Sequence, residues 1–274
     1  NKIIYKKDNA TWFNSKKINR PQDKVLIKSS GEPTYRLPDI AYHKNKFERN
    51  YDLIVDVFGA DHTDTYPDVL AVIDGIGYDT NKVKVLIHQF ITITKGSEKV
   101  KMSTRKANFI TLEELCNETG PDVLRYFFIM RGMNSHLNFD LDLAKDQSDN
   151  NPVFYLQYAH ARICNILKRV KGFGHKINLD ADLTVLETEI EQYLIKKMVG
   201  FPELVERVGI SLEPQNIVNY LQDLCSIFHK FYVLNKVISD DKSMSEARLI
   251  LTEASRIVIK NGLTILGISA PEKM

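Results

Sequence analysis

The sequence is poor in the features that mark several classes of protein. Its three cysteines, Cys116, Cys164 and Cys225, lie far apart and form no Cys-x-x-Cys pair, so neither a disulfide framework nor a zinc ribbon is expected. No apolar run approaches the roughly 18 residues that a membrane helix requires, and no basic and then apolar leader is present. We therefore expect a protein of a reducing compartment, the cytoplasm, with no membrane contact.

Residue patterns for several kinds of catalysis are also missing. The 7 histidines have no metal-ligand spacing, no serine or cysteine sits in a nucleophile elbow, and no Walker glycine pattern occurs. The sequence thus predicts no bound metal, no catalytic triad and no P-loop. With 37 Lys and Arg against 35 Asp and Glu, the net charge of +2 excludes a histone-like polycation but permits local basic patches.

What the sequence does contain is two halves of different periodicity. Its 274 residues, of which 43% are hydrophobic, suit two structural units. Between Val25 and Phe109, β-branched runs such as "YDLIVDVFGADH" and "VLIHQFITIT" alternate with helical patterns, which predicts parallel strands joined by crossover helices. The first of these helices is expected to begin at Pro38, with Leu37 extended before it.

The pattern becomes helical after residue 110. Thr111 and Glu114 are placed to form a capping box, "GPDVLRYFFIM" predicts a helix, and nearly everything after Asn150 has a helical period that ends near Gly267 and Pro271. The intervening "RGMNSHLNFDLDLAKDQSDN" is polar and rich in turn residues. The predicted fold class is therefore α/β followed by an all-α bundle.

One candidate binding site follows the strand predicted in "VFGADHTDTY". Gly59, Asp61 and His62 stand at its carboxyl end, where open α/β sheets bind their ligands. A glycine lets a ligand approach the backbone, and a carboxylate can accept hydrogen bonds from ribose hydroxyls. The alternative is an ordinary strand-to-helix turn in which Asp61 or Thr63 caps the next helix.

A second candidate is the pair Tyr35 and Asp39 in "TYRLPDIAYH". The phenol from the strand end and the carboxylate from the first helical turn suit a guanidinium or ammonium ligand. Charge-assisted hydrogen bonds to such a cation are worth roughly 1.5–3 kcal/mol each. The alternative is that Asp39 only stabilises its own helix.

Two basic segments are candidates for binding polyanions. The loop after "VLIHQFITIT" carries the basic residues Lys99, Lys101, Arg105 and Lys106. It would suit a triphosphate, and the alternative is a solvated basic loop. The segment "YAHARICNILKRVK" interleaves aromatic and basic residues as a nucleic-acid surface does, although helix exteriors often share this composition.

These segments, in this order, resemble the bacterial type of arginyl-tRNA synthetase among the class I aminoacyl-tRNA synthetases. "GADH" is similar to the family's nucleotide-binding turn, "KMSTR" to its Lys-Met-Ser-Lys-Ser loop, and "TYRLPDIAYHKNKFERNYD" to its arginine-recognition segment. "SHLNFDLDLAKDQSDNNPVFYLQYAHARI" resembles the family's passage into its anticodon-binding bundle, and "NGLTILGISAPEKM" its C-terminus. The resemblance covers essentially the whole chain.

The resemblance implies ATP-dependent charging of tRNA(Arg) with L-arginine through an arginyl-adenylate. ATP would enter as its Mg²⁺ complex, and we expect a monomer. The domains implied are a partial Rossmann-like catalytic domain with the end of its insertion over residues 1–110, a connecting region that contacts the tRNA stem over 111–148, and a helical anticodon-binding domain over 149–274.

The resemblance also implies roles for individual residues. Tyr35 and Asp39 would hold the substrate guanidinium, and Gly59, Asp61 and His62 would contact adenosine. The catalytic loop over the phosphates would be formed by Lys101, Met102, Ser103 and Arg105. Contacts with tRNA are expected from Tyr158, Arg162 and Arg248.

The sequence departs from the family pattern in several places. Thr104 stands where the loop normally has a lysine, and Thr63 with Asp64 follows "GADH" where the family often has His-Gly. The His-Ile-Gly-His element of class I enzymes does not occur, so we expect a piece of a longer protein that is inactive by itself. The alternatives are a non-catalytic RNA-binding module, which the upstream sequence would reveal, and another class I synthetase, which would bind a different amino acid.

Overall fold

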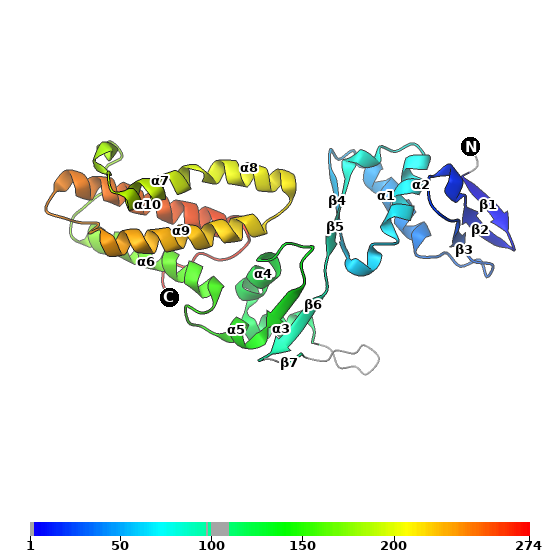
Figure 1. Cartoon of the computed structure of the whole chain (residues 1–274), viewed down its shortest axis with the longest axis horizontal. Coiled ribbons are helices and arrows are strands. Elements are labelled where there is room, and N and C mark those ends of the chain that lie inside the picture. The colour runs from blue at the N-terminus through cyan, green and yellow to red at the C-terminus, as the bar shows by residue number, and fades with distance from the viewer. Residues whose placement is uncertain (1–2, 97, 100–109) are drawn as a thin grey trace. The chain divides into compact units, whose positions relative to one another are not determined.

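The computed structural model describes residues 3–96, 98–99 and 110–274, which form two compact units (Figure 1). The first unit comprises Asn1–Phe90 with Met133–His136, and the second comprises Ile91–Gly132 with Leu137–Met274. The predicted domain boundaries at residues 110 and 148 stay predictions. Among the described residues, no helix has both the length and the apolar character needed to cross a bilayer.

The first unit joins a small antiparallel sheet to a β-α-β element. Its elements are β1 (Ile4–Lys7), β2 (Ala10–Phe13), β3 (Lys24–Ile27), α1 (Arg36–Glu48), β4 (Ile54–Gly59), α2 (Tyr66–Gly75) and β5 (Val83–His88). Strands β4 and β5 pair in parallel from Ile54↔Val83 to Gly59↔His88, with α2 as the crossover, as the sequence predicts. The core between these elements contains Phe13, Leu26, Ile40, Val69 and Ile73.

Strand β4 alternates between buried and exposed residues. Ile54 and Asp56 are buried, whereas Val55 is 40% exposed and Val57 is 61% exposed. In the part of the chain that the structure describes, β4 and β5 form a sheet of two strands. One face of β4 is therefore apolar and open.

Helix α1 begins earlier than the sequence predicts. Its first residue is Arg36, so the expectation of an extended Leu37 before a helix starting at Pro38 is wrong. The amide of Leu37 donates to the carbonyl of Thr34 at 3.1 Å, which tightens the entry into the helix. Pro38 is accommodated because it is the third helical residue, and the first amides of a helix have no partner within it.

The second unit opens with a small sheet and short helices. Its elements are β6 (Ile91–Lys95), β7 (Glu98–Lys99), α3 (Leu112–Thr119), α4 (Pro121–Ile129), β8 (Leu137–Asp140) and α5 (Leu141–Lys145). The strands have the order β7-β6-β8. The capping box of Thr111 and Glu114 at the start of α3 is confirmed, because each residue bonds the backbone amide of the other.

One expectation for this region is wrong. The run "VLIHQFITIT" is not one strand but two, since β5 ends at His88 and β6 begins at Ile91 in the other unit. The amide of Gln89 between them donates to the carbonyl of Met133 at 2.9 Å instead of continuing a ladder. The polar, turn-rich segment after α4 also contains β8, which pairs in parallel with β6, and α5.

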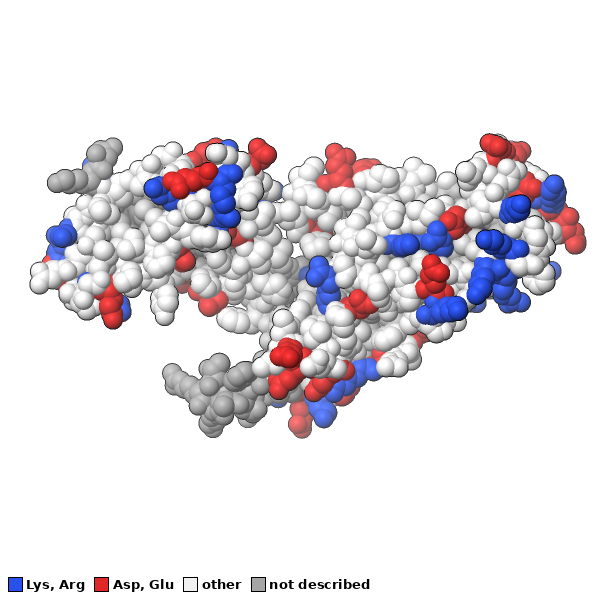
Figure 2. Space-filling view, turned by 180° about the vertical axis from the view of Figure 1, so that it is seen from behind, with Lys and Arg blue, Asp and Glu red and all other residues white. Residues whose placement is uncertain are grey.

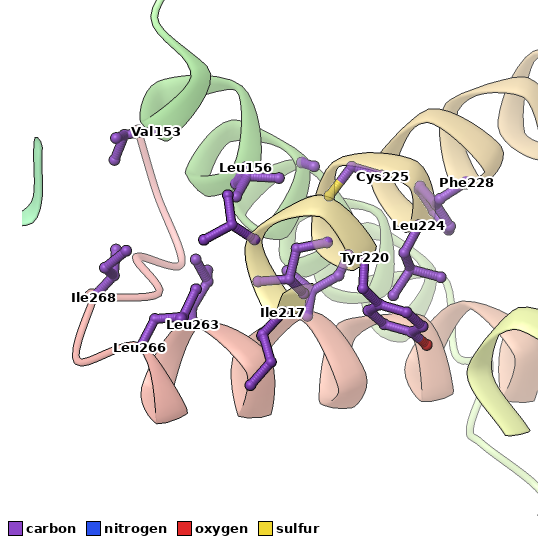
Figure 3. Close-up of a cluster of buried hydrophobic side chains, with 14 of the residues drawn as sticks. Val153, Leu156, Ile217, Tyr220, Leu224, Cys225, Phe228, Leu263, Leu266 and Ile268 are labelled. Carbon is purple, nitrogen blue, oxygen red and sulfur yellow. The ribbon is translucent and has the colours of Figure 1, made fainter. Parts of the chain in front are cut away.

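The helical bundle after residue 150 is confirmed. It consists of α6 (Pro152–Gly172), α7 (Glu189–Val199), α8 (Phe201–Ser211), α9 (Gln215–Leu234) and α10 (Lys242–Ile265). Leu156, Leu224 and Leu263 from three of these helices meet in a core that excludes solvent (Figure 3). Gly267, with a positive φ of 68°, ends the last helix as the sequence predicts.

Candidate functional site

The turn after β4 presents the predicted adenosine-binding residues. A one-turn 3-10 helix, η2 (Ala60–His62), follows Gly59, and the ring of His62 stacks on Phe58 with centroids 5.2 Å apart. A Cβ at Gly59 would lie 2.6 Å from Oδ1 of Asp61, so glycine lets the Asp61 carboxylate fold back over the strand end. The turn therefore holds His62 by ring stacking and leaves Asp61 exposed.

The two candidate sets, one for arginine and one for adenosine, share a pocket. It has a volume of about 570 Å³ and is lined by Lys28, Pro33, Thr34, Tyr35, Arg36, Asp39, Asp61, His62 and Thr65. Tyr35 precedes α1, Asp39 lies in the first turn of α1, and the other two candidates come from η2. Gly59 is the residue before η2 and does not itself line the pocket.

The charges in the pocket favour a cationic ligand. Asp39 and Asp61 bring carboxylates to the pocket. Its two cationic residues each have an acidic partner, since Lys28 pairs with Glu32 at 3.2 Å and Nε of Arg36 donates to Oδ2 of Asp68 at 3.1 Å. Asp68 is 2% exposed and accepts a second hydrogen bond from Nε of Arg20 at 2.8 Å. This shared carboxylate fixes the Arg36 side chain and offsets part of its positive charge.

The structure bears on the simpler alternatives for these residues. Helix α2 begins at Tyr66 with Thr65 as its N-cap, so the alternative in which Asp61 or Thr63 caps it is wrong. The hydroxyl of Thr63 instead donates to the carbonyl of Ala60 at 2.7 Å. Asp39 does lie in the first turn of α1, where a carboxylate also stabilises the helix.

Sequence reasoning missed residues that complete the pocket. The hydroxyl of Thr65 donates to the carbonyl of His62 at 3.1 Å and so closes the turn that carries the candidate ligands. Its place in "GADHTDTY", three positions after His62, is a signal that was available. No sequence signal pairs Arg36 with Asp68, which lies 32 residues further along the chain.

The predicted catalytic loop, with Lys101, Met102, Ser103 and Arg105, lies outside the described residues. What precedes it is a hairpin in which β6 pairs with β7 through Thr94↔Lys99. Among the residues that the structure describes, no group of three or more His, Cys, Asp or Glu side chains is arranged to hold a metal ion.

The candidate tRNA contacts in the bundle do not gather at one place. Tyr158 is 41% exposed on α6. One turn later, the guanidinium of Arg162 lies over the ring of Tyr232 on α9, 4.9 Å from its centroid. Tyr232 was not predicted, because its place beside Arg162 depends on how α6 and α9 pack.

Arg248 is engaged inside the bundle. Its Nε lies 2.7 Å from Oε1 of Glu191, whose side chain is fully buried, and only 11% of the Arg248 side chain is exposed. The other guanidinium nitrogens donate to the carbonyl of Lys236 and to Oδ1 of Asn235, each at 2.9 Å. This geometry favours a structural role for Arg248, and its contact with tRNA stays a prediction.

Basic side chains gather at one end of the bundle. Figure 2 shows Lys and Arg side chains concentrated at the end of the helical bundle that lies on the right of that view. A pocket of about 520 Å³ in the bundle is lined by Lys168, Lys171, Lys176 and Lys273, with Leu167 and Leu249 among its apolar residues. The local charge is thus positive although the net charge of the chain is only +2.

Comparison with models of protein families divides the chain into an N-terminal and a C-terminal part. Residues 1–126 match the model of the class I tRNA synthetase catalytic domain of type R, and residues 156–274 match the DALR anticodon-binding domain. These two matches agree with an α/β part followed by a helical bundle.

Individual relatives agree with the family models. The arginine–tRNA ligase of Salinibacter ruber is 50% identical over 98% of this chain and 48% of its own length. That of Chlorobaculum tepidum is 52% identical over 97% of this chain and 49% of its own length. The chain thus spans about half the length of the curated relatives that it matches.

Solved structures show the same fold. An arginyl-tRNA synthetase structure from Campylobacter jejuni has a TM-score of 0.89 and 31% identity, covering 100% of this chain and 59% of that one. The arginyl-tRNA synthetase of Thermus thermophilus, at 19% identity and a TM-score of 0.79 over 99% of this chain and 56% of that one, supports the fold alone. The two domain matches and these relatives together establish that the chain belongs to the arginyl-tRNA synthetase family.

Proposed function

We propose that this chain acts as part of a longer arginine–tRNA ligase that charges tRNA(Arg) with L-arginine at the expense of ATP. The observation that carries the proposal is the pocket that Tyr35 and Asp39 share with Asp61 and His62. A ligase of this kind must hold an amino acid and ATP side by side. This pocket offers a carboxylate and a phenol at one wall, and at the other the turn proposed to bind the nucleotide.

Asp39 and Tyr35 bind the substrate guanidinium in this proposal. The carboxylate makes charge-assisted hydrogen bonds that an amino acid without a cationic side chain cannot replace. The phenol of Tyr35, whose side chain is 94% exposed, is free to move onto the ligand. Specificity for arginine then arises because a neutral analogue leaves the Asp39 carboxylate without its partner.

The adenosine moiety lies against Gly59, Asp61 and His62. ATP enters as its Mg²⁺ complex, with the metal on the phosphates. The arginine carboxylate attacks the α-phosphate and pyrophosphate leaves, after which a ribose hydroxyl of tRNA attacks the adenylate carbonyl and AMP leaves. Lys101, Met102, Ser103 and Arg105 form the catalytic loop over the phosphates, and its two cations and its hydroxyl stabilise the charge on the departing pyrophosphate. Catalysis therefore rests on positioning and electrostatics.

The bundle binds tRNA in this proposal. The lysines at its end supply contacts with phosphates, and the exposed ring of Tyr158 with the Arg162 and Tyr232 pair supplies surfaces on which bases stack. Because phosphate contacts release counterions, binding of tRNA should weaken steeply as salt rises.

The decisive experiment uses the full-length protein that contains this chain. Asp39→Asn should raise the KM for arginine in aminoacylation about 10- to 150-fold, because one charge-assisted hydrogen bond of about 1.5–3 kcal/mol is lost. Glu48→Gln is the matched control, since Glu48 is an exposed carboxylate at the other end of the same helix and should leave the KM unchanged.

The outcome can contradict the proposal in either of two ways. An unchanged arginine KM in Asp39→Asn would remove the guanidinium role, and an unaltered full-length protein without arginylation activity would remove the function. The present chain alone should give no arginine-dependent exchange of pyrophosphate into ATP, because its sequence has no His-x-Gly-His element. Clear exchange by this chain alone would show that the ATP site is complete without that element.

A further inference from the structure

A buried hydrogen-bonded chain connects the two walls of the pocket. His43, on α1, is 4% exposed, and its Nε2 lies 2.7 Å from Oδ2 of Asp56 on β4. Its Nδ1 lies 2.8 Å from the main-chain carbonyl of Asp39, which lines the proposed substrate pocket. The other oxygen of Asp56 accepts a hydrogen bond from Lys46.

Both partners of the His43 ring are acceptors. A carbonyl oxygen and an ionised carboxylate accept hydrogen bonds and do not donate them, so a ring nitrogen that bonds either partner does so as the donor. Burial raises the pKa of Asp56, but the hydrogen bonds from His43 and Lys46 outweigh it and hold that pKa below its ordinary value. The buried carboxylate thus stays charged, and Lys46 on α1 supplies a cation to it.

The hydrogen bonds of His43 join α1, which carries Asp39, to β4, which leads into the turn that carries Asp61 and His62. Asp56 lies three residues before Gly59 on β4, which is fixed in turn by its parallel pairing with β5. Asp39, His43, Asp56 and His62 line one small cavity, which shares Asp39 and His62 with the substrate pocket. A movement of the first turn of α1 relative to the strand end must therefore stretch the hydrogen bonds of His43.

We infer that His43 is a positioning residue that sets Asp39 against the nucleotide-binding turn by bridging the Asp39 carbonyl to the Asp56 carboxylate. The inference rests on the proposed function, because it concerns the arginine and adenosine walls of that same pocket. His43 contacts neither substrate. Its effect on arginine binding must pass through Asp39.

Two neutral variants in the full-length protein separate the two hydrogen bonds. The amide nitrogen of His43→Gln can occupy the place of Nε2 and keep the bond to Asp56, whereas that of His43→Asn can occupy the place of Nδ1 and keep the bond to Asp39. A bridge needs both bonds, so each variant should raise the KM for arginine about tenfold. The KM for ATP should stay within about twofold, because β4 keeps its pairing with β5.

A double-mutant cycle supplies the test that a purely structural role would not pass. In an Asp39→Asn background, His43→Gln should change the arginine KM by less than about twofold, because the group it positions has already lost its charge. Lys44→Gln is the matched control on α1, since Lys44 forms only an exposed pair with Glu48 at 3.4 Å. It should change neither KM.

Several outcomes would overturn the inference. One is a fall in the urea midpoint of His43→Gln without any change in the arginine KM, and another is a defect in only one of the two neutral variants. Equal effects of His43→Gln with and without the Asp39 carboxylate would also overturn it. Loss of the proposed function is recognised separately, because the unaltered protein would then fail to arginylate tRNA, and the positioning role would fall with it.

Discussion

Replacing Arg248 by alanine should destabilise the bundle strongly. The guanidinium forms an ion pair at 2.7 Å with Glu191, whose side chain is fully buried between helices, and bridges to the backbone of Lys236 and the side chain of Asn235. Truncation removes every one of these donors at once. It leaves a carboxylate inside the protein without a cation.

The magnitude follows from what stays around Glu191. Breaking a buried ion pair by removing one partner costs about 3–5 kcal/mol, because a charge remains without compensation. Here Thr188 still donates to Oε2 of Glu191 from its hydroxyl at 2.7 Å and from its amide at 3.1 Å. We therefore expect the lower end, a loss of about 3 kcal/mol in the free energy of unfolding.

Urea denaturation of the 274-residue chain, followed by far-ultraviolet circular dichroism, measures this loss through the bundle helices. Arg207→Ala is the control, since Arg207 is 64% exposed and its pair with Glu203, at 3.9 Å, is solvated. That variant should stay within about 0.5 kcal/mol of the unaltered chain. An Arg248→Ala variant within about 1 kcal/mol of the unaltered chain would refute the structural role and return Arg248 to the candidates for tRNA contact.

Two further predictions concern acid stability and helix packing. Hydrogen bonds, of which the one from the Ser15 hydroxyl has the largest effect, lower the pKa of Asp23 to about 2. The stabilisation that the Asp23 carboxylate provides is therefore complete above its ordinary pKa of 3.8 and disappears as the pH falls through 2. In a pH titration of unfolding, Asp23→Asn should flatten the curve between those values, and an unchanged slope would contradict this. Gly262→Ala would place a Cβ 2.6 Å from Cδ2 of Leu221 and should cost about 1–3 kcal/mol, whereas Gly209→Ala, with open space around it, should not destabilise the chain. Equal urea midpoints for these two variants would contradict the packing argument.

Long helices were the part of the fold best predicted from the sequence. The patterns of α6, α9 and α10 repeat their apolar residues over many turns, so the period identifies both the element and its buried face. The capping box at Thr111 was equally readable, because its bonds join residues three positions apart. Interactions between residues that are close in the chain can therefore be predicted from the local sequence.

Features that depend on distant residues were not readable. No glycine, proline or other turn residue separates the strand patterns on either side of His88 and Gln89. The break between β5 and β6 depends on the bond from Gln89 to Met133. Nothing in the local sequence distinguishes Arg248 from Arg162. Arg248 is in a buried ion pair because the fold places Glu191, which lies 57 residues before it in the sequence, beside its guanidinium. The candidate residues for arginine and for adenosine were predicted as two separate sets. That they share one pocket, which Thr65 and Arg36 also line, depends on how the chain folds.

The open face of β4 has a practical consequence for work in solution. Val55 and Val57 present apolar surface beside each other on a parallel sheet, and such sheets in stable proteins are covered on both faces. Exposed apolar surface of this kind is a potential site of association between molecules. Protein concentration should therefore be varied in any measurement on this chain by itself, because association through this face would make a stability or binding constant depend on concentration.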